Sequence, residues 1–172
     1  MKIIAVDPGI NGAVVWTDTD NPGHALWFRM TSIPQYHRII RSLKTDDCVG
    51  VIECQTGCAG IRVSAPAMFK FGTTYGAWLA TFHAMGIKLH EVPPQKWMKA
   101  LDLGTRGTKK AAKGSSQQER SDIIRFNAKA KTLWKQKLAS EARRLYPRVN
   151  VILANADALL IAEYARRFIA NR

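Results

Sequence analysis

The sequence is short of acidic residues and has no long apolar run. Its 172 residues include 13 Asp and Glu against 26 Lys and Arg, so the formal net charge is +13 at pH 7. A membrane span needs about 20 apolar residues in a row, and no run approaches that length. The N-terminal segment also reaches an acid, Asp7, too soon for a signal peptide. We therefore expect an intracellular, cytoplasmic protein that binds no membrane, and the positive charge favours a polyanionic partner.

Cysteine is scarce as well, and its pattern excludes the common cysteine-based sites. Cys48, Cys54 and Cys58 are odd in number, and no histidine lies near them in the sequence. Cys54-x3-Cys58 is therefore a poor zinc motif. Reduced thiols that pack in the interior are the simpler interpretation.

The order of the apolar runs predicts an α/β fold. With 47% hydrophobic residues the chain can bury a core, and its length fits a single domain, residues 1–172. Strands are predicted at 3–6, 13–16, 25–29, 48–53 and 87–91. Helices are predicted at 34–43, 66–85, 93–101, 134–145 and 156–169. The first three strands should form an antiparallel meander and the fourth should lie parallel to the first, which gives a mixed five-stranded sheet flanked by helices.

Positive charge is concentrated in the second half of the chain. Between Lys96 and Arg148, 15 Lys and Arg face only four Asp and Glu, which accounts for +11 of the net +13. Residues 102–130 show no apolar period and are polar, basic and glycine-containing, so we predict a mobile basic loop there. Charge of one sign so localised indicates a binding face, because an ordinary solvated surface intersperses both signs. If the polyanion is DNA, the candidate DNA-binding residues are Lys96, Lys99, Arg106, Lys109, Lys110 and Lys113.

Three carboxylates occupy positions where a lone charge would be costly. Asp7 and Glu53 end short apolar runs, and Asp157 opens an apolar helix. Such acids need a partner or a cation, so three of them in one small chain indicate a shared metal site. A parallel crossover should bring Asp7 and Glu53 to the same strand end. Metal-binding carboxylates in a basic protein are what phosphodiester cleavage requires, which predicts a nuclease.

Two of these acids also have an ordinary alternative. Asp7-Pro8-Gly9 is composed of turn-forming residues and on its own would be read as a simple turn. Asp157 could merely stabilise the positive end of a helix dipole. The first alternative weakens when the three acids are considered together. The second weakens because the residues that flank Asp157 are too apolar for a turn that faces solvent.

The order and spacing of these motifs resemble the RuvC-type Holliday junction resolvases of the RNase H-like superfamily, especially the short forms carried by bacteriophages. The resemblance covers most of the chain. It rests on the segments IAVDPG, GA, VIE and ADALLIA at 4–9, 12–13, 51–53 and 156–162, with weaker support from 69–76 and 92–97. It implies a homodimer that binds four-way DNA junctions and nicks two strands symmetrically with magnesium.

The resemblance also implies roles for single residues. Asp7, Glu53 and Asp157 would be catalytic ligands of two Mg2+ ions, with Asp7 bridging both and Mn2+ able to substitute. Lys96 would hold the scissile phosphate as a fourth catalytic residue. A plain surface lysine is the alternative for Lys96, and it is the interpretation that we favour for Lys99.

One position departs from the family pattern. The family carries a fourth acidic or histidine ligand about one helical turn before the last aspartate, and here that position is Ala154. The nearest polar residue, Asn155, is expected to cap the helix rather than bind metal. Glu163 is expected to face solvent. Water or another group would then fill the vacant coordination position, or cleavage would be slow.

Further features bear on assembly and DNA contact. Small residues recur every four positions in the predicted helix 66–85 and form a smooth stripe: Gly72, Gly76, Ala80 and Ala84. Such a stripe fits close helix packing in the monomer core or in a dimer, and the resemblance favours the dimer.

The family probes the junction centre with the segment that is 54–64 here. Phe69 and Trp97 could stack on an exposed base, although burial is commoner for aromatic residues.

We therefore expect a structure-selective, magnesium-dependent endonuclease that resolves Holliday junctions and other branched DNA. Two alternatives stay open. One is a nuclease of the same fold that acts on flaps, forks or RNA. The other is a catalytically silent junction-binding protein, which Ala154 makes conceivable.

Overall fold

The chain is built on one mixed sheet of five strands. The computed structural model describes residues 1–9, 11–29, 32–54 and 64–170. The strands are β1 (Lys2–Val6), β2 (Ala13–Asp18), β3 (Ala25–Arg29), β4 (Cys48–Glu53) and β5 (Lys88–Val92). Their spatial order is β3-β2-β1-β4-β5, with β1 antiparallel to β2 and parallel to β4. The predicted meander and the parallel return of the fourth strand are both confirmed.

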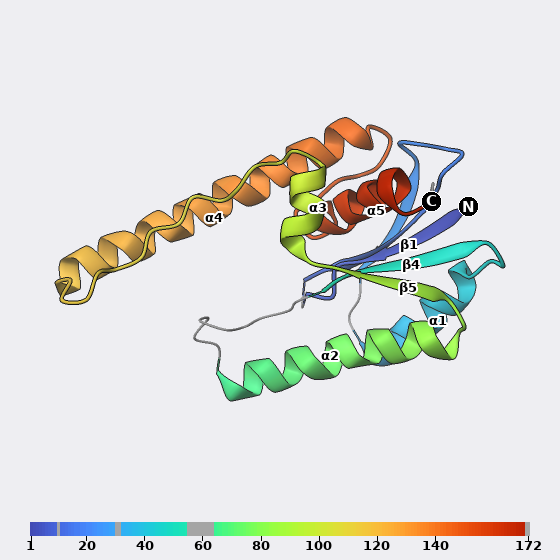
Figure 1. The fold of residues 1–172 in the computed structure, drawn as a ribbon, viewed down its shortest axis with the longest axis horizontal. Coiled ribbons are helices and arrows are strands. Elements are labelled where there is room, and N and C mark those ends of the chain that lie inside the picture. Colours follow the sequence, from blue (N-terminus) through green and yellow to red (C-terminus); the bar gives the residue numbers. More distant parts are fainter. Residues whose placement is uncertain (10, 30–31, 55–63, 171–172) are drawn as a thin grey trace.

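Helices cover both faces of this sheet (Figure 1). On one face lie α1 (Ile33–Leu43) and α2 (Ala65–Ala84), and on the other lie α3 (Pro94–Ala100), α4 (Gln117–Leu145) and α5 (Ala156–Phe168). Among the residues that the structure describes, no helix is long and apolar enough to cross a membrane. The expected mixed sheet flanked by helices is therefore confirmed.

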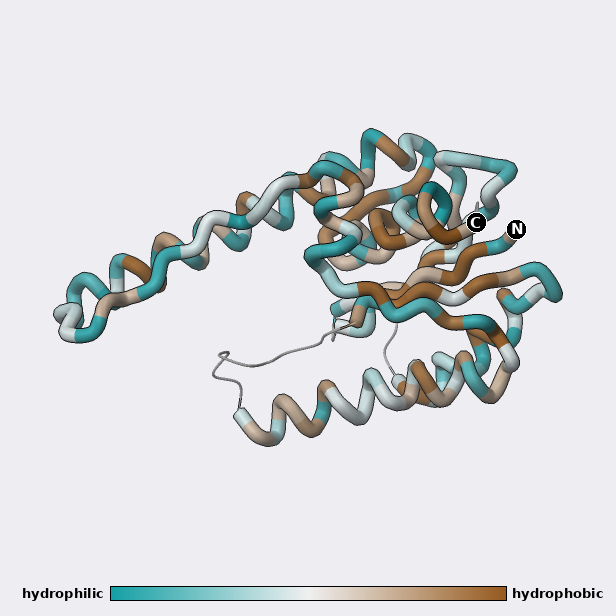
Figure 2. Tube along the Cα trace, viewed as in Figure 1, coloured by the Kyte–Doolittle hydropathy of each residue, from teal (hydrophilic) through white to brown (hydrophobic). Residues whose placement is uncertain are grey.

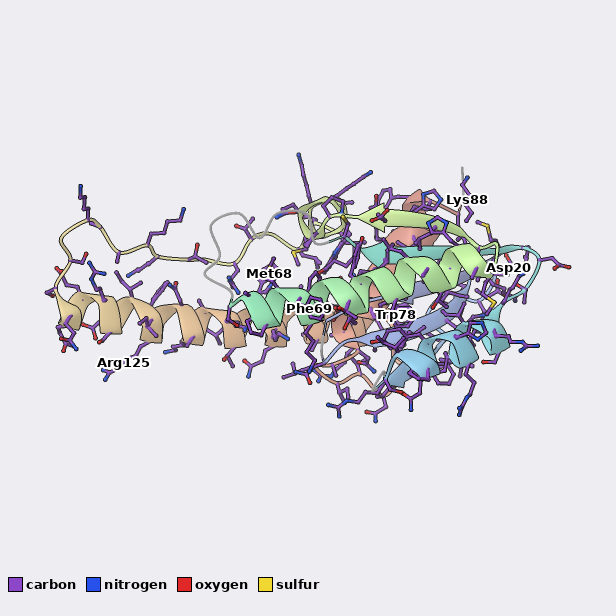
Figure 3. The ribbon with its side chains drawn as sticks, turned by 90° about the horizontal axis from the view of Figure 1, so that it is seen from below. Asp20, Met68, Phe69, Trp78, Lys88 and Arg125 are labelled. Atoms are coloured by element: carbon purple, nitrogen blue, oxygen red, sulfur yellow. The ribbon has the colours of Figure 1, made fainter. Side chains whose placement is uncertain are left out.

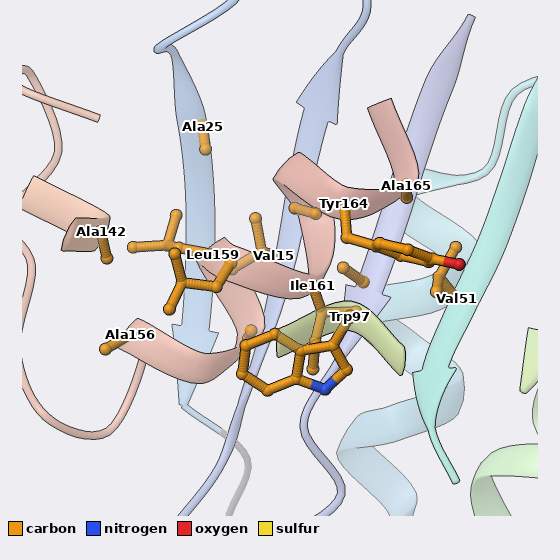
Figure 4. Close-up of a cluster of buried hydrophobic side chains, with 14 of the residues drawn as sticks. Val15, Ala25, Val51, Trp97, Ala142, Ala156, Leu159, Ile161, Tyr164 and Ala165 are labelled. Atoms are coloured by element: carbon orange, nitrogen blue, oxygen red, sulfur yellow. The ribbon is translucent and has the colours of Figure 1, made fainter. Parts of the chain in front are cut away.

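The pleat of β1 explains how one short strand supports two cores. Ile3 and Ala5 point into the core under α5, whereas Ile4 and Val6 point into the core under α1 and α2. Successive side chains of a strand leave opposite faces, so a strand covered on both sides must be apolar throughout. Figure 2 shows mainly hydrophobic colour along the central strands. Figure 4 shows the α5 side of the sheet.

The two cores are filled in different ways. Gly50 lies on β4 under α2, and a Cβ atom added there would sit 2.6 Å from the ring of Phe82. Because real Cβ atoms do not approach that closely, α2 can seat Phe82 on the sheet only if this position is glycine. The opposite core is filled mainly by α5, in which nine residues are buried.

The basic segment differs from the expected loop. Residues 117–130, predicted to be part of a loop that spans 102–130, form the first half of the 29-residue helix α4. Ser116 and Glu119 start this helix with a capping box. Pattern analysis missed the helix because its first half packs against no core and so needs no apolar period. Its many Gln, Glu, Arg, Lys and Ala residues favour helix nonetheless.

This half of α4 and the segment before it form a projection that we call the arm, residues 104–130 (Figures 1 and 3). The segment runs back along the helix and is tied to it by Asn127, whose side chain accepts from the Lys109 N–H at 2.9 Å and donates to the Lys109 carbonyl at 2.9 Å. Arg125, labelled in Figure 3, lies on the arm well away from the sheet. The arm carries seven Lys and Arg against two acids.

Candidate metal centre

The three carboxylates line one cavity at the carboxyl end of the central strands. In the parallel pair β1 and β4, Val6 is in register with Ile52, so the next residues, Asp7 and Glu53, lie side by side at the carboxyl ends of the two strands. Asp157 enters from the first turn of α5, which packs on β1. All three line a cavity of about 480 Å³, which we call the acid cavity. The structure thus brings together acids that are far apart in the sequence.

The backbone after β1 is shaped around Asp7. The Gly9 N–H donates to Asp7 Oδ1 at 2.9 Å, and the Asp7 N–H donates to the Ala13 carbonyl at 3.1 Å. A Cβ atom added to Gly12 would lie 2.1 Å from the carbonyl oxygen of Asp7, so only glycine fits there. The turn interpretation of Asp7-Pro8-Gly9 and the site interpretation are therefore compatible, because the turn is what holds the carboxylate.

The surroundings of the acid cavity disfavour the simultaneous ionisation of Asp7 and Asp157. Burial raises the pKa of Asp7, although the Gly9 N–H and the charge of Lys135 act in the opposite direction. Burial first, and then the charge of Asp7, raise the pKa of Asp157 to about 6. Two carboxylates in mutual repulsion and partly removed from water are stabilised by a shared cation.

Glu53 is buried and is oriented by an aromatic residue. Trp97 of α3 donates its indole N–H to Glu53 Oε2 at 3.0 Å. Figure 4 shows Trp97 against α5 beside Leu159 and Ile161, and its side chain is fully buried. Trp97 therefore does not offer its ring to a DNA base, and the alternative of burial holds. The contact could not be read from the sequence, because 44 residues separate the two partners.

The cations at the acid cavity differ from those expected. Arg29 at the end of β3 and Lys135 of α4 line the cavity, whereas Lys96 is not among its described lining residues. Lys96 is exposed on α3, and together with burial and Lys88 it lowers the pKa of His90 on β5, the strand at the sheet edge. Sequence reasoning missed the placement of Lys135 because it depends on the angle at which α4 crosses α5.

In the segment before α5, Ala154 keeps its expected place beside the acids, whereas the role of Asn155 differs from the prediction. Ala154 lines the acid cavity, so the position without an oxygen ligand does face it. Asn155 is the N-terminal boundary residue of α5, but its side chain does not cap the helix. It accepts from the Ile152 N–H at 2.9 Å and donates to the Asn150 carbonyl at 3.0 Å. The predicted side-chain cap is therefore wrong, because the buried amide is used to fold the preceding loop.

The exposure of Glu163 also differs from the sequence prediction. The sequence predicts that it faces solvent, but its side chain is only 4% exposed. Arg166 and Arg167, one turn further along α5, donate to its carboxylate at 2.6 to 2.8 Å. A helical pattern alone does not reveal that Glu163 is buried, because α5 is covered on almost all sides rather than along one stripe.

The donor set of the acid cavity fits a hard divalent cation. Within the described residues, no three His, Cys, Asp or Glu side chains are already arranged as a metal-binding cluster. Three carboxylates nevertheless face the same cavity, and oxygen ligands are those that Mg2+ and Mn2+ prefer. Neither histidine nor cysteine lines the cavity among the described residues, so a zinc or copper site is not favoured.

The other candidate DNA-binding residues lie on or beside the arm. Lys99 and Arg106 line a second pocket at its base. The rest are exposed along the arm, with Lys109 Nζ placed 4.3 Å from the ring centroid of Phe126. The segment 54–64, expected to probe a junction, falls outside the described residues except for its two ends. Phe69, in contrast, is 78% exposed on α2 and is available for contact (Figure 3).

Comparison with known proteins connects this geometry to solved structures. No protein-family model and no curated protein matches the sequence. The fold, however, is similar to that of RuvC from Thermus thermophilus solved in complex with a Holliday junction substrate, with a TM-score of 0.57 and 13% identity, over 99% of this chain and 98% of that one. A second structure of Thermus thermophilus RuvC gives a TM-score of 0.56 at 17% identity, over 97% and 96% of the two chains. The chain therefore has the RNase H-like fold of these RuvC structures.

Proposed function

We propose that the protein is a metal-dependent endonuclease that cuts branched DNA, with the Holliday junction as its preferred substrate. The observation that carries the proposal is the meeting of Asp7, Glu53 and Asp157 around one cavity in a chain of net charge +13. Likeness to a structure solved with a Holliday junction supports the substrate class. A basic arm beside the cavity provides a surface for the phosphates of the DNA.

Asp7, Glu53 and Asp157 would hold Mg2+, or Mn2+ in its place, as a pair of ions. Bound there, the metal would supply an activated water and would stabilise charge on the leaving oxygen. The chain contributes the rest of the site. Gly9 and Trp97 hold two of the carboxylates in position, and Lys135 attracts the phosphate into the cavity. We assign this phosphate contact to Lys135 rather than to Lys96.

The substrate class is tested by comparing cleavage of an immobile four-way junction, a flap, a fork and a plain duplex under identical conditions. Preferential cleavage of the junction is expected. Preference for the flap or the fork would identify a nuclease of the same fold with another substrate. Tight junction binding without cleavage in Mg2+ or Mn2+ would identify a silent binding protein, the alternative that Ala154 makes conceivable.

Trp97→Phe should reduce cleavage by about 10- to 100-fold, the usual cost of losing a group that orients a metal ligand. The substitution removes the N–H that Glu53 accepts, so the Mg2+ concentration needed for half-maximal cleavage should also rise. Trp78→Phe is the matched control, because Trp78 is equally buried but lies in the core on the other side of the sheet. An unchanged Mg2+ requirement in Trp97→Phe would show that Trp97 has only a packing role.

A homodimer through α2 is part of the same proposal. The structure excludes one explanation of the small-residue stripe, because Gly72, Gly76, Ala80 and Ala84 are all exposed rather than packed in the monomer core. A Cβ atom added to Gly72 or Gly76 would meet no atom within 4 Å. An exposed smooth stripe allows a second helix to approach closely.

The wild type should therefore sediment as a dimer at micromolar concentration, and Gly76→Leu should shift it towards monomer by placing bulk on the contact. Lys70→Leu adds a leucine elsewhere on the exposed part of α2 and should leave the dimer intact. A monomeric wild type that still makes paired nicks in one junction would contradict the dimer.

A further inference from the structure

A second pocket lies at the base of the arm, between α3, the segment that follows it and α4. Its volume is about 580 Å³, larger than the acid cavity, and its described lining includes none of the three carboxylates. We call it the Trp134 pocket. The residues that matter for its chemistry are Gln95, Met98, Lys99, Asp102, Arg106 and Trp134. Its size is within the range of sites that bind small planar ligands.

The floor of this pocket is apolar and aromatic. Trp134 is half-buried and packs against the core beside Met98. Lys137 lies 5.6 Å from the centre of the Trp134 ring and donates to the Leu103 carbonyl at 2.6 Å. Lys137 lines a smaller neighbouring hollow and not the Trp134 pocket. Trp134 itself lines both hollows, so the Trp134 pocket meets the indole without including Lys137.

The residues at the mouth of the pocket include both cations and hydrogen-bonding groups, which suit the phosphate and the base of a nucleotide. Lys99 and Arg106 are exposed cations that suit phosphates. At the edge of a base, the Gln95 amide can donate or accept hydrogen bonds and the Asp102 carboxylate can accept them. Asp102 has a φ of 53°, which is uncommon for any residue except glycine. This conformation ends α3 and turns the chain around the pocket, where the Leu103 N–H donates to the Met98 carbonyl at 3.0 Å.

The pocket also has a fixed relation to the acid cavity. Trp134 and Lys135 are consecutive residues of α4, and Lys135 lines the acid cavity. The two hollows therefore flank the same turn of one helix. A DNA strand whose phosphate is held in the acid cavity would therefore pass a pocket with room for a base on the same helix.

We propose that the Trp134 pocket binds one unpaired DNA base, stacked on Trp134, while Lys99 and Arg106 contact the neighbouring phosphates. Aromatic stacking accepts any base, so the pocket confers a preference for unpaired DNA rather than for a sequence. The inference rests on the proposed action on branched DNA, because a branch point is where bases lose their partners. It adds a subsite to that function and does not depend on cleavage.

The test compares a single-stranded oligonucleotide of thymidines with an oligomer of the same length and charge that lacks bases. The wild type should bind the thymidine strand about tenfold more tightly, because stacking adds to the phosphate contacts. Trp134→Phe should keep most of this preference. Trp134→Leu should lose it and still bind the abasic oligomer as the wild type does. Leu133→Ala, an exposed neighbour that lines only the smaller hollow, should behave as the wild type.

Equal binding of the two oligomers by the wild type would overturn the proposal, and so would a Trp134→Leu variant that keeps the full preference. If Trp134→Leu does not fold, photocrosslinking of a strand containing 5-iododeoxyuridine to the wild type decides instead. Crosslinks should map to Trp134 or Met98, and crosslinks found only elsewhere would contradict the proposal. If the protein cuts junctions but shows no preference for the strand with bases, only the proposed base-binding pocket is contradicted. If it prefers the strand with bases but never cuts, only the proposed nuclease function is contradicted.

Discussion

Asp7→Asn is expected to abolish cleavage while junction binding stays the same or becomes tighter. The loss should exceed the roughly 10- to 100-fold cost of losing a group that only orients a ligand, because Asp7 is itself proposed to bind the metal. Binding should not weaken, since the substitution removes a negative charge that faces phosphates. Asp157→Asn should behave in the same way, because both residues line the acid cavity.

The control for this prediction is Asp122→Asn. Asp122 is exposed on the arm, so its substitution changes the net charge by the same amount without touching the acid cavity. Cleavage should persist in this variant. Retained cleavage by Asp7→Asn would show that the acid cavity is not the catalytic centre, whatever its effect on binding.

Changing Lys109, Lys110 and Lys113 to alanine should weaken junction binding equally for all DNA sequences. Every lysine that pairs with a phosphate steepens the dependence of log affinity on log salt by about 0.9, so the triple substitution should flatten that slope by nearly three units. Affinity rather than the cleavage rate at saturating protein should change, because these lysines do not line the acid cavity. Binding measured over a series of salt concentrations provides both the affinity and the slope.

Three exposed cations at α1 and its C-terminal end, Arg38, Arg41 and Lys44, provide a control of equal charge on the opposite face of the sheet. Their substitution should leave the salt dependence almost unchanged. If the arm variant also binds with the wild-type slope, the arm does not touch the phosphates. The positive face would then lie on the part of α4 that runs from Lys135 to Arg144.

The carboxylates could be predicted from the sequence because each is marked by its local surroundings. Asp7 and Glu53 end apolar runs, and the parallel crossover between those runs fixes their common edge. The meander, the long helix α2 and the buried helix α5 could also be predicted from the sequence, because each has an apolar pattern typical of its type.

The features that sequence analysis missed depend on contacts between distant segments or on the lack of a core. The exposed half of α4 has no apolar period, so only its capping box and composition could have indicated a helix. The pairing of Trp97 with Glu53, the burial of Glu163 and the place of Lys135 at the acid cavity all follow from helix packing. Only the partners of Glu163 could have been predicted from spacing within one element, because Arg166 and Arg167 lie three and four residues further along the same helix.

The most direct test of the account is cleavage of an immobile four-way junction labelled on each strand in turn. We expect the wild type to make paired nicks in two opposite strands when Mg2+ or Mn2+ is present. We expect no nicks when the metal is chelated or when Asp7 is replaced by asparagine. Nicking that continues without a divalent metal, or that survives in Asp7→Asn, would contradict the claim that Asp7, Glu53 and Asp157 form a metal-dependent nuclease centre.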